Sequence, residues 1–188
     1  QNIKKDVGNL DFVVHALAYS DKDELKGKYL ETSRKNFLST LDISAYSFTR
    51  ISRSATKIMK NGGSLLTLSY IGSNKTTPNY NVMGVAKAAL ETSVKYLSVD
   101  LGKKNIRVNA ISAGPMKTLA GAAISGARHV YRYSEKIAPL QKNPDLEQVG
   151  NAALYLLSDI SSGVTGLTHY VDGGLKIVGI PNQDLVNI

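Results

Sequence analysis

The sequence contains no cysteine, which excludes a disulfide, a thiolate metal site and a cysteine nucleophile. This absence fits a reducing compartment. Long apolar runs are missing too: the longest cover a few residues, far fewer than the roughly 20 that a membrane-spanning helix needs. No signal-peptide pattern opens the chain, which begins with Gln1 inside a polar helical pattern. We therefore expect neither a signal peptide nor membrane insertion.

A phosphate-binding glycine loop is also missing. None of the 16 glycines forms a G-x-G-x-x-G or similar loop between a strand and a helix. No acidic residue follows such a loop at the distance that would suit a ribose. The usual signature of a dinucleotide site is therefore not found in this chain.

The composition is that of an ordinary globular domain. The 188 residues suffice for one domain with a proper core, and 43% are hydrophobic and 20% charged. A net charge of +8 suits nucleic acid, an anionic membrane surface or an acidic protein partner. The basic residues are spread along the chain, with no zinc-finger spacing or RNA-binding aromatic signature, so nucleic acid is not expected as the main partner.

Strand and helix patterns alternate along the chain. Short apolar runs predict strands at 10–18, 65–70, 107–112 and 168–172, the first covered on both faces. Apolar periodicity predicts helices at 32–60, from about 80 to 102 and from 145 to about 158, the first irregular near Asp42 and the last capped by Asp145. This order predicts an α/β fold with a doubly wound parallel sheet of the Rossmann type.

A tyrosine and a lysine stand out on the second helix. Tyr80 and Lys87 are seven residues apart, about two turns or roughly 10 Å of rise, at nearly the same angular position. A long lysine leans back toward the phenol, and its charge would lower the pKa of Tyr80. Tyr70, at the end of the preceding strand, brings a second hydroxyl to the same region. Spacing alone favours the plainer alternative of a half-buried core tyrosine and an ordinary surface lysine.

Two strand ends are further candidates, because ligands bind beyond the carboxyl ends of parallel strands. The first strand places Ala16, Leu17 and Ala18 at such an edge, although a plain strand end is an equal alternative. The turn 114–118 that closes the third strand has backbone groups suited to a ligand, although a structural strand-ending Gly-Pro explains it as well. His15 is expected to be a core or hydrogen-bonded histidine and not a base.

Several segments, in order, carry a resemblance to a known family. Residues 66–70 (LTLSY), 78–84 (PNYNVMG) and 86–88 (AKA) resemble the active site of the bacterial NADH-dependent enoyl-acyl carrier protein reductases. These form the branch of the short-chain dehydrogenase/reductase superfamily that uses Tyr-x6-Lys in place of Tyr-x3-Lys. Residues 10–16 (LDFVVHA), 107–115 (RVNAISAGP) and 171–174 (VDGG) agree, so the resemblance runs from about residue 10 to 175.

The resemblance implies a cytoplasmic oxidoreductase that reduces trans-2-enoyl-acyl carrier protein with NADH in fatty-acid elongation. It implies catalytic roles for Tyr80, Lys87 and Tyr70: the first stabilises the enolate oxygen, the second holds ribose hydroxyls, and the third lines the acyl pocket. The cofactor contacts implied are Ala16, Leu17, Ser69, Lys87, Gly114, Pro115, Met116, Thr118 and Ala120. The substrate contacts implied are Ala18, Ser20, Tyr70, Tyr80, Met83, Ala120 and Ile124. No metal site is expected.

The resemblance also carries expectations about mobility and partners. Small residues dominate from 118 to 127, and we expect a mobile substrate-binding lid at about 116–135. Its local basic cluster is a candidate contact for an acidic carrier protein, although a solvated charged face is equally consistent; the cluster comprises Arg128, Arg132, Lys136 and Lys142. A homotetramer follows by analogy, through the helices at 32–60 and after Tyr80.

The family carries its glycine-rich loop in a segment that would precede Gln1, so we expect this chain to be an N-terminally incomplete single reductase domain. That segment also holds the residues that choose between NADH and NADPH. One alternative is therefore a non-catalytic or truncated short-chain reductase fragment. A β-ketoacyl-carrier-protein reductase is the other, but it places tyrosine four and serine seventeen residues before the lysine, where Met83 and Tyr70 stand here.

Overall fold

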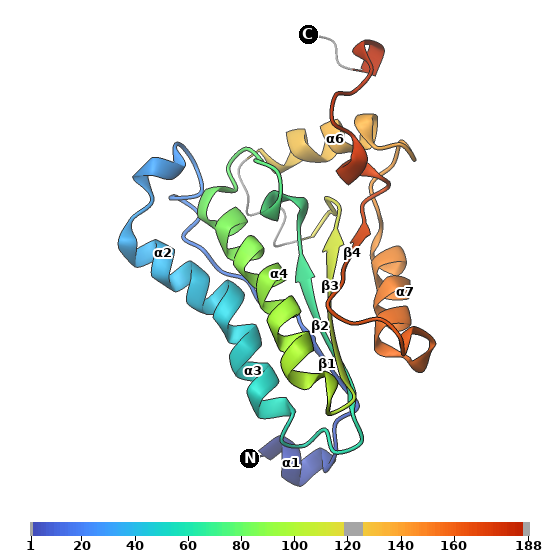
Figure 1. Ribbon diagram of the computed structural model, residues 1–188. Coiled ribbons are helices and arrows are strands. Elements are labelled where there is room, and N and C mark those ends of the chain that lie inside the picture. Colours follow the sequence, from blue (N-terminus) through green and yellow to red (C-terminus); the bar gives the residue numbers. More distant parts are fainter. Residues whose placement is uncertain (1, 119–125, 186–188) are drawn as a thin grey trace.

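The computed structural model describes residues 2–118 and 126–185 (Figure 1). Its centre is a four-stranded, fully parallel sheet in the order β1-β2-β3-β4. The strands are β1 (Phe12–His15), β2 (Gly63–Ser69), β3 (Ile106–Ala113) and β4 (Thr168–Val171). The helices are α1 (Asn2–Val7), α2 (Arg34–Leu41), α3 (Ser47–Ala55), α4 (Asn81–Gly102), α6 (Ala127–Ile137) and α7 (Leu146–Leu157). Helices α2, α3 and α4 lie on one face and α7 on the other, which confirms the doubly wound Rossmann-type fold.

Strands β2 and β3 form the centre of the core because successive side chains point to opposite faces. Leu65 and Val108 pack with Leu90 of α4 on one face. Leu66 and Ile111 pack against α7 on the other. All five side chains are fully buried. The continuous apolar runs of these strands thus reflect burial on both faces.

Strand β1 differs from the expected strand, since it covers four residues and one of its faces is exposed. Val13 packs into the core beneath α3 and α4. Phe12 and Val14, which point the other way, remain 52% and 46% exposed. Helix α7 contacts β2, β3 and β4, and β1 lies beyond this cover at the edge of the described sheet. The prediction that β1 is covered on both faces was therefore wrong for the described chain.

The long helix expected at 32–60 is interrupted where irregularity was predicted. Helix α2 ends at Leu41, a π-helix η2 (Asp42–Tyr46) follows, and α3 runs on to Ala55. Within η2, the Ser44 hydroxyl accepts a hydrogen bond from the Tyr19 N–H and donates one to the Tyr19 carbonyl, both at 2.9 Å. Just after η2, the Ser47 hydroxyl lies 2.8 Å from Nε2 of the buried His15. Ser44 of the π-turn and Ser47 at the start of α3 thus hold the chain on both sides of residues 16–18.

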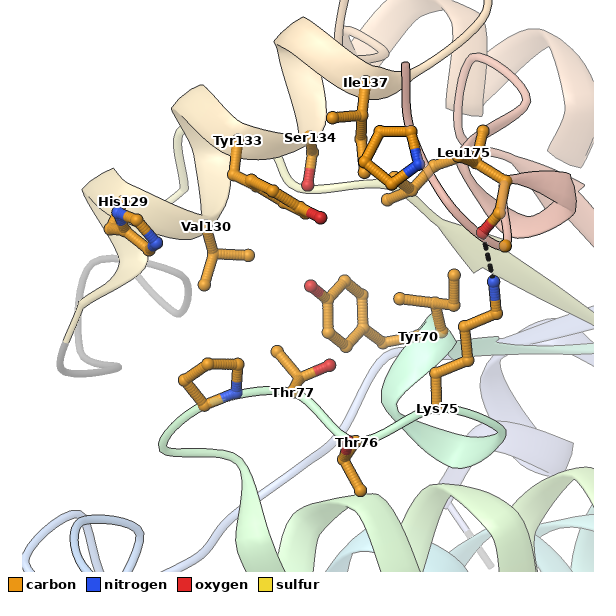
Figure 2. A pocket seen from close by; sticks show the side chains of 15 residues that line it. Tyr70, Lys75, Thr76, Thr77, His129, Val130, Tyr133, Ser134, Ile137 and Leu175 are labelled. Carbon is orange, nitrogen blue, oxygen red and sulfur yellow. Dashed lines mark hydrogen bonds between the residues drawn. The ribbon is translucent and has the colours of Figure 1, made fainter. Parts of the chain in front are cut away.

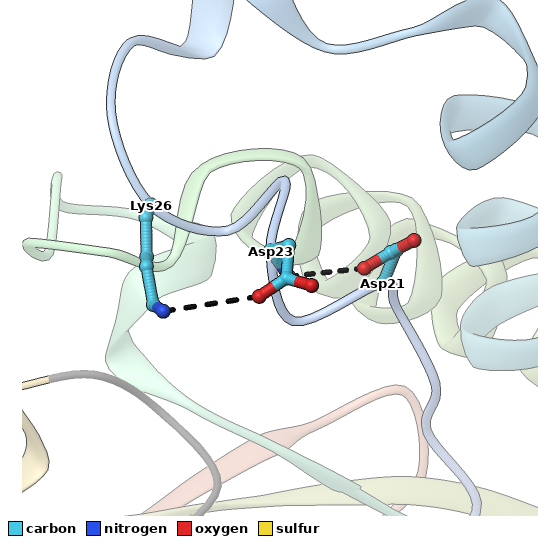
Figure 3. Close-up of polar contacts among 3 residues, drawn as sticks. All are labelled: Asp21, Asp23 and Lys26. Carbon is cyan, nitrogen blue, oxygen red and sulfur yellow. Dashed lines mark hydrogen bonds and ion pairs between the residues drawn. The ribbon is translucent and has the colours of Figure 1, made fainter.

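The loop after β1 continues to the short 3-10 helix η1 (Tyr29–Glu31). Figure 3 shows part of this loop, where the Asp23 N–H donates to the Asp21 carboxylate and the Asp23 carboxylate lies 3.8 Å from the Lys26 ammonium. Both side chains of the ion pair are largely exposed, so it contributes little stability. The firmer anchor is Asn36 of α2, whose side-chain oxygen accepts from the Asp21 N–H at 3.0 Å.

Helix α7 begins with the predicted cap. The Asp145 carboxylate accepts from the Gln148 N–H at 2.8 Å, and the Gln148 side chain accepts from the Asp145 N–H at 3.1 Å. This reciprocal pair is a capping box. Helix α7 supplies Val149 and Leu156 to the core, so its start matters for the sheet face that it covers.

Asp145→Ala is expected to destabilise the protein by about 1 kcal/mol, because the Gln148 N–H loses the carboxylate that caps it. Thermal unfolding followed by circular dichroism should show a midpoint lowered by about 2–4 °C. Asn151→Ala, at an exposed position in the middle of α7, is the matched control and should leave the midpoint unchanged or raise it. An equal midpoint for Asp145→Ala and the wild type would show that the cap does not stabilise the fold.

Candidate active site

The predicted site residues converge where three parallel strands end. Ala16, Leu17 and Ala18 follow β1 and are exposed, Tyr70 follows β2, and Gly114 follows β3. Because all four strands are parallel, these ends share one edge of the sheet. Helix α4 starts at the same edge and carries Lys87 beside the end of β2.

Tyr80 is the N-cap residue of α4 and is only 6% exposed. Its ring meets that of Tyr70 edge-on, with centroids 5.0 Å apart. The residues on either side of it, Asn79 and Asn81, have φ angles of 57° and 34°, in a left-handed region that asparagine tolerates better than most residues. The Asn81 side chain donates to the Leu25 carbonyl at 3.1 Å. The two asparagines therefore allow a turn with positive φ angles on both sides of Tyr80, and this turn fixes the position of the phenol.

Two glycines allow the chain to approach this phenol closely. A Cβ at Gly72 would lie 2.5 Å from the Tyr80 ring, and a Cβ at Gly84 would lie 2.7 Å from the Gly72 carbonyl oxygen. Neither distance is possible without movement, and the second contact is with backbone. Glycine at both positions thus lets the turn after β2 pack between Tyr80 and α4.

Gly84→Ala is expected to displace the Gly72 turn and with it the Tyr80 ring. The strain should exceed the gain in helix propensity and destabilise the protein by about 1–2 kcal/mol. Gly150→Ala in α7 is the matched control, since a Cβ there meets nothing within 4 Å, and it should stabilise the protein by about 0.5–1 kcal/mol. Urea unfolding of both variants measures the two effects. The same sign for both would contradict the packing argument.

Lys87 is buried in the site, at 7% exposure, and is not the surface lysine of the plainer alternative. Its Nζ donates to the Leu68 carbonyl at 2.7 Å. Burial lowers the pKa of Lys87 to about 8, and the negative charge of Glu91 acts in the opposite direction.

The expected effect of Lys87 on Tyr80 is corrected by the structure. Burial raises the pKa of Tyr80 above its ordinary value, and electrostatic repulsion from the neighbouring Tyr70 and Glu91 groups raises it further. The prediction that the lysine lowers the pKa of Tyr80 was wrong, because sequence spacing revealed neither the depth of burial nor the nearby carboxylate. Tyr80 is therefore a neutral phenol and a hydrogen-bond donor.

Glu91 is the residue that sequence reasoning missed at this site. It is 9% exposed and accepts a hydrogen bond from the Ser69 hydroxyl at 2.5 Å. The signal was present, because Glu91 follows Lys87 by four residues and so lies on the same face of α4. Its bond with Ser69 also means that this hydroxyl, a predicted cofactor contact, has a protein partner.

His15 behaves as expected for a hydrogen-bonded core histidine. It is 2% exposed, with Nδ1 2.8 Å from the Thr67 hydroxyl and Nε2 2.8 Å from the Ser47 hydroxyl. Burial lowers the pKa of His15 to about 4, and the charge of Lys87 lowers it as well. The ring is therefore neutral at physiological pH, so it adds no charge to the site.

Other predicted contacts lie at or near this edge. The Ser20 hydroxyl belongs to a polar network with Asn36 and Thr40 of α2. Met83 is 7% exposed and packs with Tyr80, so its side chain lies mostly inside the core. Met116 packs against the α7 side of the core. Its carbonyl accepts from the Thr118 N–H at 3.0 Å.

The turn after β3 has a structural role in addition to its predicted one. Gly114 is buried, and its N–H donates to the Val171 carbonyl at 2.8 Å. A Cβ at this position would lie 2.8 Å from Pro144. Pro115 follows at intermediate exposure. Two predicted contacts, Ala120 and Ile124, lie outside the described residues.

A cavity of about 340 Å³ opens beside Tyr70. Figure 2 shows Tyr70 and Tyr133 reaching into it from opposite sides, with Ile137 and Leu175 at its apolar end. Burial raises the pKa of the Tyr70 phenol, while a hydrogen bond with Thr77 acts in the opposite direction. Tyr80 does not line this cavity; it lines a neighbouring one of about 450 Å³ beyond Gly72. The two tyrosines thus share an edge contact but face different spaces.

Part of the expected lid is regular. Residues 127–137, most of which belong to the lid expected at about 116–135, form the helix α6. Ser134 and Ile137 are buried beneath the helix, which gives it an inner face. Arg128, Arg132 and Lys136 are exposed on it, as is Lys142 beyond its end.

Metal ligation and membrane spanning find no support among the residues that the structure describes. No group of three or more histidine, aspartate or glutamate side chains in residues 2–118 and 126–185 is placed to hold a metal ion. Among the described helices, none is both long and apolar enough to cross a membrane.

A parallel Rossmann-type sheet with a tyrosine and a lysine on one helix at its carboxyl edge defines a reductase-like α/β protein. The sequence profile of the family described as Enoyl-(Acyl carrier protein) reductase matches residues 1–176. The chain belongs to this enoyl-(acyl carrier protein) reductase family, which confirms the resemblance found in the sequence.

Individual relatives agree. The chain is 59% identical, over 96% of its length, to Enoyl-[acyl-carrier-protein] reductase [NADH] 1 of Rhizobium meliloti, of which it covers 66%. It is 55% identical, over 95% of its length, to Enoyl-[acyl-carrier-protein] reductase [NADH] FabI of Rickettsia conorii, of which it covers 68%. A crystal structure of the Anaplasma phagocytophilum reductase in complex with NAD matches with a TM-score of 0.93 and 56% identity, over 96% of this chain and 69% of that one. The chain thus spans about two thirds of the length of these relatives.

Proposed function

We propose that the protein reduces the double bond of a trans-2-enoyl thioester on acyl carrier protein, with NADH as the electron donor, in cytoplasmic fatty-acid elongation. The observation that carries the proposal is the convergence of Tyr70, Tyr80 and Lys87 at the carboxyl edge of the sheet. Relatives at 55–59% identity are named as NADH-dependent reductases of this substrate class.

The residues at the edge fit the nicotinamide half of a dinucleotide. Ala16, Leu17 and Ala18 form an exposed segment after β1. It is held at its two ends by Ser47 of α3 and Ser44 of the π-turn. Lys87 offers an ammonium donor, and residues 114–116 line the end of β3. Bound NADH would supply the hydride that the thioester accepts. We assign the hydroxyls of its ribose to Lys87 and the rest of its nicotinamide half to these backbone segments and to Thr118.

Tyr80 is assigned the stabilisation of the thioester oxygen, on which negative charge develops as the double bond is reduced. A donor aimed at that oxygen strengthens its interaction as the charge grows. Because burial raises the pKa of Tyr80, the phenol keeps its proton and can donate it as a hydrogen bond. Lys87 adds positive potential, and Tyr70 borders the acyl pocket at the 340 Å³ cavity.

We assign the acidic carrier protein to the outer face of α6. Arg128, Arg132 and Lys136 repeat every four residues, so they share one exposed face, and Lys142 extends the charge beyond the helix. This cluster lies over the cavity that Tyr133 and Ile137 line from the same helix. A negatively charged carrier would thus deliver its acyl chain beside Tyr70.

We infer that subunits associate through the helices opposite α7, as a homotetramer. Apolar side chains are exposed on this face: Tyr96 and Val99 of α4 are 73% and 79% exposed, and Tyr46 of η2 is 49% exposed. Exposed apolar residues gathered on neighbouring helices are typical of an interface. Size-exclusion chromatography with light scattering tests this assignment directly.

The experiment that tests the proposed reaction follows NADH absorbance after addition of a trans-2-enoyl thioester of acyl carrier protein. Oxidation that depends on the enoyl thioester supports the proposal. A β-ketoacyl thioester serves as the control substrate and should not be reduced, because Met83 and Tyr70 replace the residues that carbonyl reduction needs. NADH oxidation with the ketone alone would favour the β-ketoacyl reductase, and oxidation with neither would favour a non-catalytic fragment.

A further inference from the structure

Glu91 is a buried carboxylate that the proposed reaction leaves without a role. It is 9% exposed on the inner face of α4, one turn after Lys87. Removing a carboxylate from water is costly unless donors and a countercharge replace its hydration. The groups that contact the Glu91 carboxylate therefore indicate its role.

Three donors surround the carboxylate. Oε1 accepts from the Ser69 hydroxyl at 2.5 Å and from the Ser73 hydroxyl at 2.6 Å. Oε2 accepts from the Asn74 side-chain amide at 3.2 Å. Ser69 ends β2, and Ser73 ends the 3-10 turn η3 (Ile71–Ser73). Through these two hydroxyls, the Glu91 carboxylate is bonded to the chain on both sides of Tyr70.

Lys87, one turn earlier on α4, supplies positive charge to the same region without a direct ion pair to Glu91. From α4 itself, Glu91 raises the pKa of Lys87. From β1, His15 also interacts with Lys87 but is neutral at physiological pH, since its pKa is about 4. From β2, Leu68 contributes a carbonyl and no charge. Glu91 is therefore the negative charge that opposes the desolvation of the Lys87 ammonium.

We propose that Glu91 is a positioning residue of the active site: its carboxylate ties both ends of the Tyr70 segment to α4 and keeps Lys87 charged. The proposal rests on the proposed reductase function for its effect on turnover, but not for its effect on Lys87. A glutamine could accept the two hydroxyls through its oxygen, but it would present an amide donor to the Asn74 amide and no charge to Lys87. Both tasks together require the carboxylate.

The effect of the Glu91 charge on the titration of Lys87 is tested on the protein without substrate. Lysines labelled with ¹³C are titrated by NMR, with the Lys87 signal assigned through Lys87→Arg. We expect a midpoint near pH 8 in the wild type and one lower by about one unit or more in Glu91→Gln. Asp100→Asn removes the same charge from an exposed position on α4 and should leave the midpoint unchanged. An unchanged midpoint in Glu91→Gln overturns this half of the proposal, whether or not the protein reduces enoyl thioesters.

The hydrogen bonds that connect the Tyr70 segment to Glu91, called the tie, are tested by a double-mutant cycle that leaves Glu91 in place. Ser73→Ala should lower turnover in the wild type but have little effect in Tyr70→Phe, because that variant has already lost the Tyr70 hydroxyl that the Ser73–Glu91 bond helps to place at the cavity. The Lys87 midpoint should stay near pH 8 in Ser73→Ala, which separates the tie from the charge. An equal fold-loss from Ser73→Ala in both backgrounds overturns the positioning of Tyr70. A wild type without any enoyl-dependent turnover contradicts the proposed function, while the NMR titration still decides the role of the charge.

Discussion

Tyr80→Phe is expected to lower the turnover of the enoyl thioester by about 10²- to 10³-fold while the fold stays intact. The substitution removes one hydroxyl and keeps the ring, so the contacts with Tyr70 and Gly72 remain. What is lost is the donor that we assign to the developing negative charge on the thioester oxygen. The raised pKa of Tyr80 makes the phenol a poor acid in the free protein, so its contribution comes through hydrogen bonding.

The measurement is steady-state NADH oxidation at saturating enoyl thioester, with thermal unfolding as the check on folding. Tyr96→Phe removes a hydroxyl from the same helix at a position that is 73% exposed, and it should retain full turnover. Near-normal turnover in Tyr80→Phe would refute the role assigned to the phenol. A loss of the same size in Tyr96→Phe would point instead to a general effect on α4.

Much of this fold follows from local patterns. The continuous apolar runs at 65–70 and 107–112 predicted buried parallel strands because both faces of β2 and β3 meet a helix layer. Asp145 predicted the start of α7, since its carboxylate and Gln148 satisfy N–H groups only a few residues away. Irregularity near Asp42 was expected too, and it takes the form of a π-turn. In each case the deciding interactions lie within one element or on one periodic face.

What escaped prediction depends on contacts between elements far apart in the chain. The apolar run predicted that Phe12 and Val14 are buried, but both are exposed, because α7 covers β2, β3 and β4 and does not extend over β1. The direction of the Tyr80 pKa depends on the Gly72 turn and on the Glu91 carboxylate, which tertiary packing brings together. Short-range spacing placed Tyr80 and Lys87 on one helix, but it carries no information about the dielectric around them.

Lys87→Met is expected to lower turnover by at least about 10²-fold, because the site loses the positive charge and the donor assigned to ribose hydroxyls. Methionine has a similar length and no charge, so the buried volume stays nearly filled. The loss should appear in both turnover and the Michaelis constant for NADH. Lys87→Arg keeps a charge but not the compact ammonium, and it should recover only part of the activity.

Stability should change far less than turnover, which separates a functional role from a structural one. The folded pKa of Lys87, about 8, lies below its ordinary value of 10.5, so burial of the charged form opposes folding at neutral pH. Between pH 8 and 10.5 the unfolded chain binds more protons, and the stability of the wild type should therefore rise with pH across this window. Lys87→Met lacks this titration and should be moderately less stable than the wild type at pH 7, because the Leu68 carbonyl loses a donor and the Glu91 carboxylate loses the positive charge near it.

Urea unfolding of both proteins at pH 7, 8 and 10 measures the difference across the titration of Lys87. The stability of the wild type should gain on that of Lys87→Met as the pH rises, while wild-type turnover falls through pH 8 as the ammonium is lost. A variant that is inactive and also strongly unfolded at pH 7 would make Lys87 a structural residue. A variant that is folded, inactive and free of the pH-dependent change in stability would identify the charge of Lys87 as a requirement of the reaction and not of the fold.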